Sequence, residues 1–390
     1  MTKKNQIVLV FVGSYFPGFK AGGLVRAIKN TVIHLKRDFD FKIITRDRDV
    51  GDTFPYQNIL RAKWVDGDSE SIYYIPKEKQ SIISLMRIIN KVSSDVIYLN
   101  SFFDPISIKI ILLLKLNLVP TRKAVVAPRG EFAWPSLKQK YFKKYIYMLF
   151  AKYFKLYKNI VWHASCEQES FDIFKYMQRD GGPIQIETVA DLPPDLSIIQ
   201  EKYCSVPGTE NYGRLKIIFL SRISPEKNLD IALRILGNLT ECVDFDIYGP
   251  AENTKYWERC QNLIAKLPSN IVVNYRGSVP AERVTQIFEG YDLFLFPTGG
   301  EAWGHVIAES LIAGTPVLVS KNTPWTKLEE LGFGWDIDLG DIHKFASTIS
   351  NFSKITITER LKIRKLIQAK IGVYLLNPEI LEKNKNLLSA

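Results

Sequence analysis

The chain has 390 residues, of which 46% are hydrophobic and 24% charged, and a net charge of +11. This composition excludes a mainly disordered chain, and the length favours two domains over one core. Residues 1–190 hold 30 Lys and Arg against 17 Asp and Glu, whereas residues 191–390 hold 22 against 24. We therefore expect the N-terminal half to meet an anionic membrane, nucleic acid or phosphorylated acceptor.

Neither an export signal nor a membrane span is evident in the sequence. Residues 7–12 are apolar but predict a buried strand. The apolar segment 106–119 is interrupted by Lys109 and Lys115 and falls short of the roughly 20 residues that a spanning helix needs. The cysteines show no paired metal-ligand spacing: Cys166, Cys204, Cys242 and Cys260. We expect a protein of the reducing cytoplasm.

Short apolar runs alternate with amphipathic segments in the first half of the chain. The runs predict strands near residues 7–12, 41–45, 96–100, 124–127 and 160–163. The amphipathic segments predict helices near residues 22–37, 81–92, 105–118, 136–157 and 166–177. This alternation predicts a largely parallel sheet with helices on both faces, in an acceptor-binding domain of residues 1–191.

A second domain of the same kind is expected after a linker rich in Pro and polar residues at 192–213. Strands are predicted near residues 215–221, 243–249, 271–276, 292–297 and 315–320. Ser224 is the expected cap of the first helix of this donor domain, residues 214–355, with Pro225 at the first helical position. Residues 356–390 are expected to be helical and could pack back across the N-terminal domain.

The predicted fold class is therefore α/β, with two doubly wound Rossmann-like domains facing each other across a cleft. Such sheets bind ligands at the carboxyl ends of their strands. Residues 297–300 stand at such a position, where Gly299 and Gly300 allow backbone N–H groups to approach a ligand. A helix N-terminus near Gly304 would favour an anion such as a diphosphate.

Two glutamates accompany this turn, Glu301 and Glu309. Eight residues of helix would separate them by about 12 Å, which suits two ends of one extended ligand. One carboxylate could hold a sugar and the other a ribose, because both accept hydrogen bonds from hydroxyl groups. Taken alone, the pattern is also typical of an exposed acidic helix start.

Arg222 and Lys227 follow another predicted strand of the same domain. There they could neutralise the charge that develops on a nucleotide diphosphate leaving group, although such a basic pair is usually only solvent-facing. Ser278 and Val279 follow a third strand, where exposed backbone could bond a base edge; an ordinary turn explains them equally well.

Together these segments resemble the retaining glycosyltransferases of family 4, which have the fold called GT-B. The resemblance extends to Gly22-Gly23, to residues 128–130, and to residues 313–317 and 323–325, so it covers nearly the whole chain. It implies that Glu301 contacts the donor hexose and Glu309 the ribose, and that backbone at the two glycines lies near the donor phosphates. The catalytic residues that it implies are Glu301, Arg222 and Lys227.

The complete donor site expected from the motifs and the resemblance contains Gly22, Gly23, Arg222, Lys227, Ser278, Val279, Gly299, Gly300, Glu301, Gly304, His305, Val306 and Glu309. Retention in this family is usually explained by attack on the same face of the sugar, with the leaving phosphate helping to deprotonate the acceptor. Such a mechanism needs no dedicated nucleophile.

The chain departs from the family where many members carry a histidine near the acceptor. Asn100 stands in that neighbourhood and cannot titrate, so it could position a hydroxyl but not remove its proton. Asn100, Arg129 and Glu131 are the acceptor-binding candidates, and Asp104 is a further weak one. His163 and His305 could equally be structural.

Metal dependence is not expected. The pairs Asp47-Arg-Asp49 and Asp66-Gly-Asp68 have the spacing of a metal-binding motif of other glycosyltransferases, but we interpret both as solvated turns. Arg222 and Lys227 would supply the positive charge instead. No cofactor is expected besides the donor, a UDP- or GDP-sugar.

Residues 136–159 contain seven lysines, eight aromatic residues and no acid. Such a helix could lie in a membrane interface, with Lys138, Lys140, Lys143 and Lys144 on anionic lipid. Alternatively, its aromatic rings pack inward and its lysines are merely solvated. Single-stranded nucleic acid would explain the basic charge but not the four charged donor-site residues.

The sequence thus predicts a hexosyltransferase of the bacterial surface-polysaccharide type, adding a sugar to a glycan acceptor linked to a lipid diphosphate. We expect it on the inner face of the cell membrane as a peripheral protein. Two alternatives stay open: a sugar-nucleotide 2-epimerase of the same fold, and a non-catalytic basic binding protein.

Overall fold

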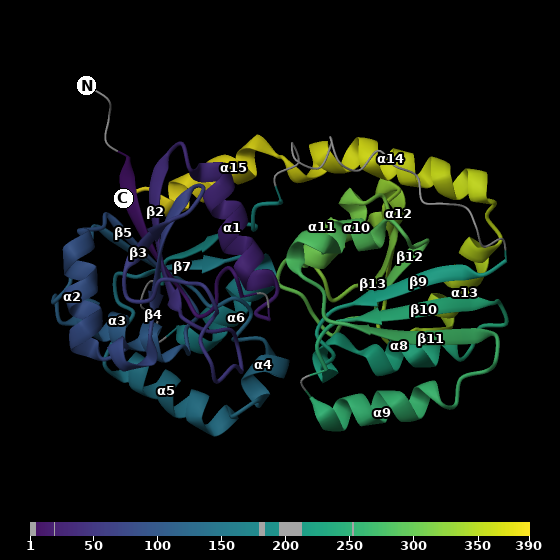
Figure 1. Cartoon of the computed structure of the whole chain (residues 1–390), viewed down its shortest axis with the longest axis horizontal. Coiled ribbons are helices and arrows are strands. Elements are labelled where there is room, and N and C mark those ends of the chain that lie inside the picture. The colour runs from purple at the N-terminus through teal and green to yellow at the C-terminus, as the bar shows by residue number, and fades with distance from the viewer. Residues whose placement is uncertain (1–4, 19, 179–183, 195–212, 252) are drawn as a thin grey trace. The chain divides into compact units, whose positions relative to one another are not determined.

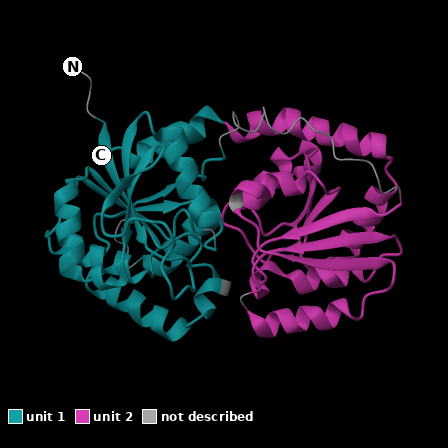
Figure 2. Cartoon of the chain, in the orientation of Figure 1, with its two compact units in different colours: residues 1–194, 377–390 teal, residues 195–376 magenta. Residues whose placement is uncertain are grey.

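A computed structural model describes residues 5–18, 20–178, 184–194, 213–251 and 253–390 (Figure 1). The chain divides into two compact units, residues 1–194 with 377–390, and residues 195–376 (Figure 2). Most of the linker predicted at residues 192–213, together with Cys204, lies outside the described residues.

The first unit is built on a sheet with the strand order β3-β4-β2-β1-β5-β6-β7-β8. Among the described strands, β3 and β4 pair antiparallel and the other neighbours are parallel. The strands are β1 (Gln6–Val12), β2 (Phe39–Arg46), β3 (Trp64–Asp66), β4 (Glu70–Ile75), β5 (Val96–Asn100), β6 (Lys123–Ala127), β7 (Val161–Ala164) and β8 (Ile186–Thr188). The helices are α1 (Gly23–Leu35), the 3₁₀ turn η1 (Lys77–Lys79), α2 (Ile82–Val92), α3 (Pro105–Lys115), α4 (Trp134–Lys138), α5 (Tyr141–Tyr153), α6 (Glu167–Met177) and α15 (Pro378–Leu388).

Both faces of this sheet are buried, which explains the apolar run at residues 7–12. Because successive strand residues point to opposite faces, Leu9 and Phe11 join one core cluster, with α2, α3, α5 and α6. Val8 and Val10 join the other cluster, with α1 and α15. In α15, Leu387 is buried in that second cluster.

The sequence prediction missed three strands of the first unit, β3, β4 and β8. The strand β4 begins with Glu70, a residue that disfavours a strand prediction, yet this carboxylate is buried and accepts hydrogen bonds from Tyr15 and Lys29. The helix predicted at residues 136–157 is two helices, α4 and α5. The helical conformation is interrupted at Lys140, whose φ of 57° is not helical.

The second unit has a parallel sheet with the strand order β11-β10-β9-β12-β13-β14. Its strands are β9 (Leu215–Leu220), β10 (Val243–Tyr248), β11 (Ile271–Gly277), β12 (Leu293–Phe296), β13 (Val317–Ser320) and β14 (Gly334–Ile337). Its helices and 3₁₀ turns are η2 (Pro225–Lys227), α8 (Leu229–Leu236), α9 (Thr254–Ile264), η3 (Ala281–Arg283), α10 (Val284–Phe288), α11 (His305–Ile312), α12 (Leu328–Leu331), α13 (Ile342–Ser353) and α14 (Ile357–Leu375).

One expectation about a helix end in the second unit is wrong. Ser224 does not cap an α-helix: Pro225–Lys227 is a 3₁₀ turn, α8 begins only at Leu229, and the buried Ser224 Oγ has no hydrogen-bond partner. The segment expected to be helical from residue 356 forms two helices, α14 in the second unit and α15 in the first. Asn377 caps a new helix, α15, in which Pro378 takes the first turn.

Each sheet has one point where the strand order reverses. In the second unit the chain runs from β9 through β10 to β11 and then returns to place β12 on the other side of β9. In the first unit the same reversal places β5 beside β1. The loops after these strands diverge at their carboxyl ends, where doubly wound sheets bind ligands.

Candidate active site

The reversal point of the second sheet brings together two motifs that are far apart in the sequence. The loop after β9 carries Arg222 and Lys227, and the loop after β12 carries Gly299, Gly300 and Glu301. The side chains of Lys227 and Glu301 meet, with 2.6 Å between Nζ and Oε1. Two of the predicted donor-site residues are therefore in direct contact across 74 residues of sequence.

This ion pair is sheltered but still accessible to solvent. The side chains of Lys227 and Glu301 are 13% and 16% exposed. The ammonium group also lies 5.9 Å from the centre of the Phe296 ring. Since an ammonium donates three hydrogen bonds and a carboxylate accepts several, both groups keep capacity for a ligand.

Hydrogen bonds between the two loops hold the pair in place. The Gly299 N–H donates to the carbonyl oxygen of Glu226 at 2.8 Å. The Asn228 amide donates to the Pro297 carbonyl at 3.0 Å, and the buried Thr298 hydroxyl donates to Glu226 O at 3.3 Å. Asn228 and Thr298 are not among the predicted site residues, and neither carries a charge. Their only sequence signal was their place beside the motif residues.

The helix after Glu301 begins at His305, so the expected helix N-terminus near Gly304 is confirmed, whereas the spacing that placed Glu301 on the helix is wrong. Gly304 is the N-cap of α11, with a φ of 83° that a residue with a side chain rarely adopts. The Trp325 indole N–H donates to the Trp303 carbonyl oxygen at 2.6 Å and closes the loop from outside. Glu301 therefore lies in a loop and not on the helix, so the 12 Å estimate does not apply.

The residues of α11 itself are mostly buried. Glu309 is 6% exposed and His305 is 8% exposed, with its ring 4.5 Å from that of Trp303. Val306 packs partly against the core. The first N–H groups of an α-helix have no acceptor within the helix itself, so this end of α11 favours an anion.

Three other predicted donor residues lie at the rim of the second sheet's carboxyl edge. The Arg222 side chain is 49% exposed and lies 3.8 Å from Glu226 Oε1, so it is held less firmly than Lys227. Ser278 is exposed and Val279 packs against the core. They follow β11, which is two strands away from β9.

In the first unit, the backbone is open where the glycine pair was expected to meet the donor. Gly22 is the N-cap of α1, with a φ of 61°, and no atom lies within 4 Å of the place where a Cβ would stand. Gly23 is exposed. The start of α1 therefore has space beside Gly22, and a helix N-terminus of this kind suits a phosphate.

Asn100 and Arg129 lie together at the reversal point of the first sheet. Asn100 is buried and its Oδ1 accepts from Arg129 Nε and Nη2, both at 3.0 Å. Arg129 also donates to Asp191 at 2.5 Å and to the Tyr98 hydroxyl at 2.6 Å. These contacts make Arg129 the centre of a buried network, in which three partners already occupy its guanidinium group.

His163 extends the same network. Its Nδ1 lies 2.7 Å from the Tyr98 hydroxyl and its Nε2 lies 2.8 Å from the Val189 carbonyl oxygen. Burial, assisted by the positive charge of Arg129, lowers the pKa of His163 to about 4. The ring is therefore neutral at pH 7 and its contacts are structural.

Glu131 holds the loop that follows β5. It accepts hydrogen bonds from Ser101 Oγ at 2.6 Å and from the N–H groups of Phe102 and Phe103 at 2.6 and 3.2 Å. Burial raises its pKa. Asp104, in the same loop, caps α3 and pairs with Arg46.

The interpretation of both Asp-x-Asp pairs as solvated turns is wrong for one of them. Asp47 and Asp49 are 0% and 5% exposed, and Asp47 pairs with Arg48 and Arg61. Asp66 and Asp68 are exposed. Within the described ranges, no three His, Cys, Asp or Glu side chains are grouped so that they could hold a metal ion.

Solved structures of other proteins share this fold. The whole chain superposes on sucrose-phosphate synthase from Thermosynechococcus elongatus with a TM-score of 0.67 at 13% identity, covering 98% of each chain. Its fold is also similar to that of HepE of Anabaena in complex with UDP-glucose (TM-score 0.66, 15% identity, 98% of each chain). It also resembles WaaG, a glycosyltransferase involved in lipopolysaccharide biosynthesis (TM-score 0.66, 15% identity, 98% of this chain and 100% of WaaG). The fold is GT-B, which confirms the predicted fold class.

A protein-family model also matches part of the sequence. Residues 207–366 match the family model described as glycosyl transferases group 1. The matched region contains Arg222, Lys227, Glu301 and Glu309. No curated protein matches the chain by sequence. The family match and the fold together support a glycosyltransferase.

Proposed function

We propose that the protein is a retaining glycosyltransferase of family 4 that moves a hexose from a UDP- or GDP-sugar to a glycan acceptor, without a metal ion. The observation that carries the proposal is the pair Lys227 Nζ–Glu301 Oε1, 2.6 Å apart at the reversal point of the second sheet. A cation for the diphosphate and a carboxylate for sugar hydroxyls stand side by side there, and Glu301 precedes the first residue of α11 by four residues.

In the proposed reaction the bond between the anomeric carbon and the diphosphate oxygen breaks. Lys227, Arg222 and the first N–H groups of α11 stabilise the negative charge that the leaving diphosphate gains. The acceptor hydroxyl attacks the same face of the sugar, and its proton passes to the leaving phosphate oxygen. Glu301 positions the hexose through its hydroxyl groups, and Glu309 is assigned to the ribose.

Three observations support the choice of donor and acceptor. HepE, of the same fold, is described in complex with UDP-glucose, and WaaG is involved in lipopolysaccharide biosynthesis. The basic N-terminal half of this chain suits an acceptor that carries phosphate. We therefore propose a lipid-diphosphate-linked glycan as the acceptor, in surface-polysaccharide synthesis.

A thermal-shift screen with UDP-glucose, GDP-mannose and ADP-glucose tests the donor assignment. A ligand at 100 times its Kd stabilises the native state by about 2.7 kcal/mol, which raises the melting temperature by several degrees. One of the uridine or guanosine sugars should give this rise, and it should persist in EDTA. If none of the three shifts the melting temperature, the proposal is wrong and the binding-protein alternative gains support.

Product analysis with the stabilising donor separates the two enzyme alternatives. A transferase releases the nucleotide faster when a glycan acceptor is added. A 2-epimerase converts the donor to its epimer with no acceptor present. Detection of the epimer in the acceptor-free reaction would replace the proposed activity.

A further inference from the structure

The outer face of α5 is apolar, the reverse of the usual arrangement for a surface helix. Phe142, Ile146, Leu149 and Tyr153 follow the spacing i, i+4, i+7 and i+11, which places them along one side of the helix. Their exposed fractions are 74%, 49%, 49% and 70%. Four large apolar side chains in a row therefore face away from the core.

The opposite side of α5 packs against the first unit. Met148 and Ala151 are 3% and 1% exposed. The Tyr147 hydroxyl lies 2.8 Å from that of Tyr157. The helix is thus firmly attached through its inner side, and its outer side takes no part in the core.

Lys144 belongs to the inner side, which corrects its place in the predicted membrane patch. Its Nζ donates to the Ser136 carbonyl oxygen at 2.7 Å and lies 4.9 Å from the centre of the Phe103 ring. Burial lowers its pKa. The inward-packing alternative is in turn wrong for most of the aromatic residues of the segment. Those that are exposed are Tyr141, Phe142, Tyr145, Phe150, Tyr153 and Phe154.

Exposed lysines flank both ends of the apolar stripe. Lys138, Lys140 and Lys143 are exposed near its N-terminal end, and Lys155 and Lys158 beyond its C-terminal end. The sequence contains no acidic residue from 132 to 166. A protein partner of this surface would have to be both apolar and strongly acidic, whereas anionic bilayers present such an environment everywhere.

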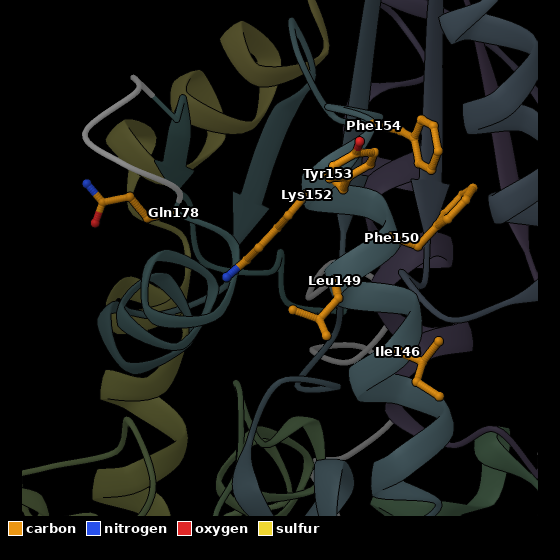
Figure 3. A pocket seen from close by; sticks show the side chains of 7 residues that line it. All are labelled: Ile146, Leu149, Phe150, Lys152, Tyr153, Phe154 and Gln178. Carbon is orange, nitrogen blue, oxygen red and sulfur yellow. The ribbon is translucent and has the colours of Figure 1, made fainter.

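The aromatic residues and the shape of the surface also suit lipid. The ring of the exposed Trp134 lies 6.0 Å from that of Tyr141, which stacks on Tyr145 at 5.7 Å. Indole and phenol rings favour the boundary between headgroups and acyl chains. An open hollow of about 720 Å³ is lined by Ile146, Leu149, Phe150, Lys152, Tyr153, Phe154 and Gln178 (Figure 3).

Figure 3 shows how this hollow is formed. Ile146, Phe150 and Phe154 project to one side of the α5 ribbon, and Leu149 and Lys152 project to the other. The rings of Phe150 and Phe154 are 4.5 Å apart. Side chains spread in this way leave room for flexible acyl chains between them, and do not enclose one rigid ligand.

We propose that the outer face of α5 inserts into the interface of a bilayer that contains anionic lipid. The apolar stripe enters the acyl boundary and the bordering lysines contact lipid phosphates. The inference goes beyond the proposed reaction, since it depends only on the surface of the first unit. If the proposed function also holds, this contact brings the acceptor-binding unit to the lipid that carries the acceptor.

Co-sedimentation with vesicles tests the insertion, with no donor or acceptor present. The full chain should bind vesicles of phosphatidylcholine with 30% phosphatidylglycerol far more strongly than pure phosphatidylcholine. The variant Lys138→Glu/Lys140→Glu/Lys143→Glu should lower the partition coefficient on the order of 100-fold at 0.1 M salt, given several-fold per charge. The variant Phe142→Ser/Leu149→Ser should lower it about tenfold, because the apolar contact is lost.

Matched controls separate this surface from a general effect of charge or exposure. Lys77→Glu/Lys79→Glu/Lys91→Glu makes the same charge change at exposed sites of the first unit, and Ile83→Ser/Leu116→Ser replaces exposed apolar residues elsewhere. Both should retain at least half of the vesicle binding. Glu301→Ala should also bind vesicles normally, so failure of the donor assignment would leave this result intact.

Three outcomes would overturn the inference. The first is equal binding of the α5 variants and their controls. The second is a dimer in analytical ultracentrifugation that Phe142→Ser/Leu149→Ser converts to a monomer, since a second copy would then cover the stripe. The third is binding of single-stranded oligonucleotides that competes with the vesicles and is stronger at the same salt concentration.

Discussion

The reversal points of the two sheets use polar side chains in different ways. In the second unit, Lys227 and Glu301 pair with each other and remain accessible to a ligand. In the first unit, Arg129 is engaged by Asn100, Tyr98 and Asp191 in a buried network. The difference teaches that the same topological position can present charges to a substrate or use them to hold the loops in shape.

The largest effect should follow from breaking the buried network. Arg129→Ala removes the cation from Asp191 and the donors from Tyr98 and Asn100, so the free energy of unfolding should fall by 3 to 5 kcal/mol, on the order expected for a broken buried pair. Urea denaturation measures this loss. Arg122→Ala removes an exposed partner of Asp95 in the same unit and should cost less than about 1 kcal/mol. Equal losses in the two variants would show that the network is not structural.

The pair in the second unit should affect catalysis and not stability. Lys227→Ala and Glu301→Ala should each lower kcat/KM for sugar transfer about 100- to 1000-fold, as for removal of one charge-stabilising group. Their melting temperatures should stay within a few degrees of the parent protein. The exposed Arg259→Ala, which removes a partner of Asp230 in the same unit, should retain normal turnover. Normal turnover in Lys227→Ala and Glu301→Ala would place the active site elsewhere.

The smallest of these effects is a pH dependence of stability from His163. The unfolded chain takes up a proton near pH 6.5, whereas burial holds the pKa of folded His163 at about 4. The folded state is therefore fully favoured above pH 6.5 and loses stability as the pH falls towards 4. Between pH 7 and pH 5 the expected loss is about 2 kcal/mol.

Denaturation of His163→Gln at the two pH values checks this expectation. The variant should be less stable than the parent at pH 7 but should show a flatter dependence on pH. His343→Gln, an exposed position of α13, should keep the parent's dependence. A dependence unchanged in His163→Gln would assign the titration to another group.

The sequence predicted the fold from the alternation of apolar runs and amphipathic segments. It also predicted that Arg222, Lys227 and Glu301 would lie near one another. Both predictions rest on local patterns: strand and helix periodicities are visible in short windows, and the carboxyl ends of parallel strands meet at one edge. The strand β4 was missed although it ends in the apolar run Ile72–Ile75, because a run this short does not distinguish a strand by periodicity alone.

The side-chain environments could not be obtained in this way. Asp47 resembles a loop residue in a polar stretch, but its carboxylate is buried against Arg48 and Arg61. Arg129 follows a strand as a binding residue would, but its guanidinium faces inward. Such contacts join residues far apart in the sequence, so no local window contains both partners.

The helix α5 shows most directly which features the sequence determines and which the tertiary structure decides. The sequence alone shows that residues 136–159 are basic, aromatic and free of acidic residues, because composition does not depend on tertiary contacts. It could not determine which side faces outward, because large apolar residues lie on both sides of this helix. The tertiary structure decides the orientation. Lys144 contacts the Ser136 carbonyl oxygen and the Phe103 ring on the inner side. Phe142, Leu149 and Tyr153 are exposed on the outer side.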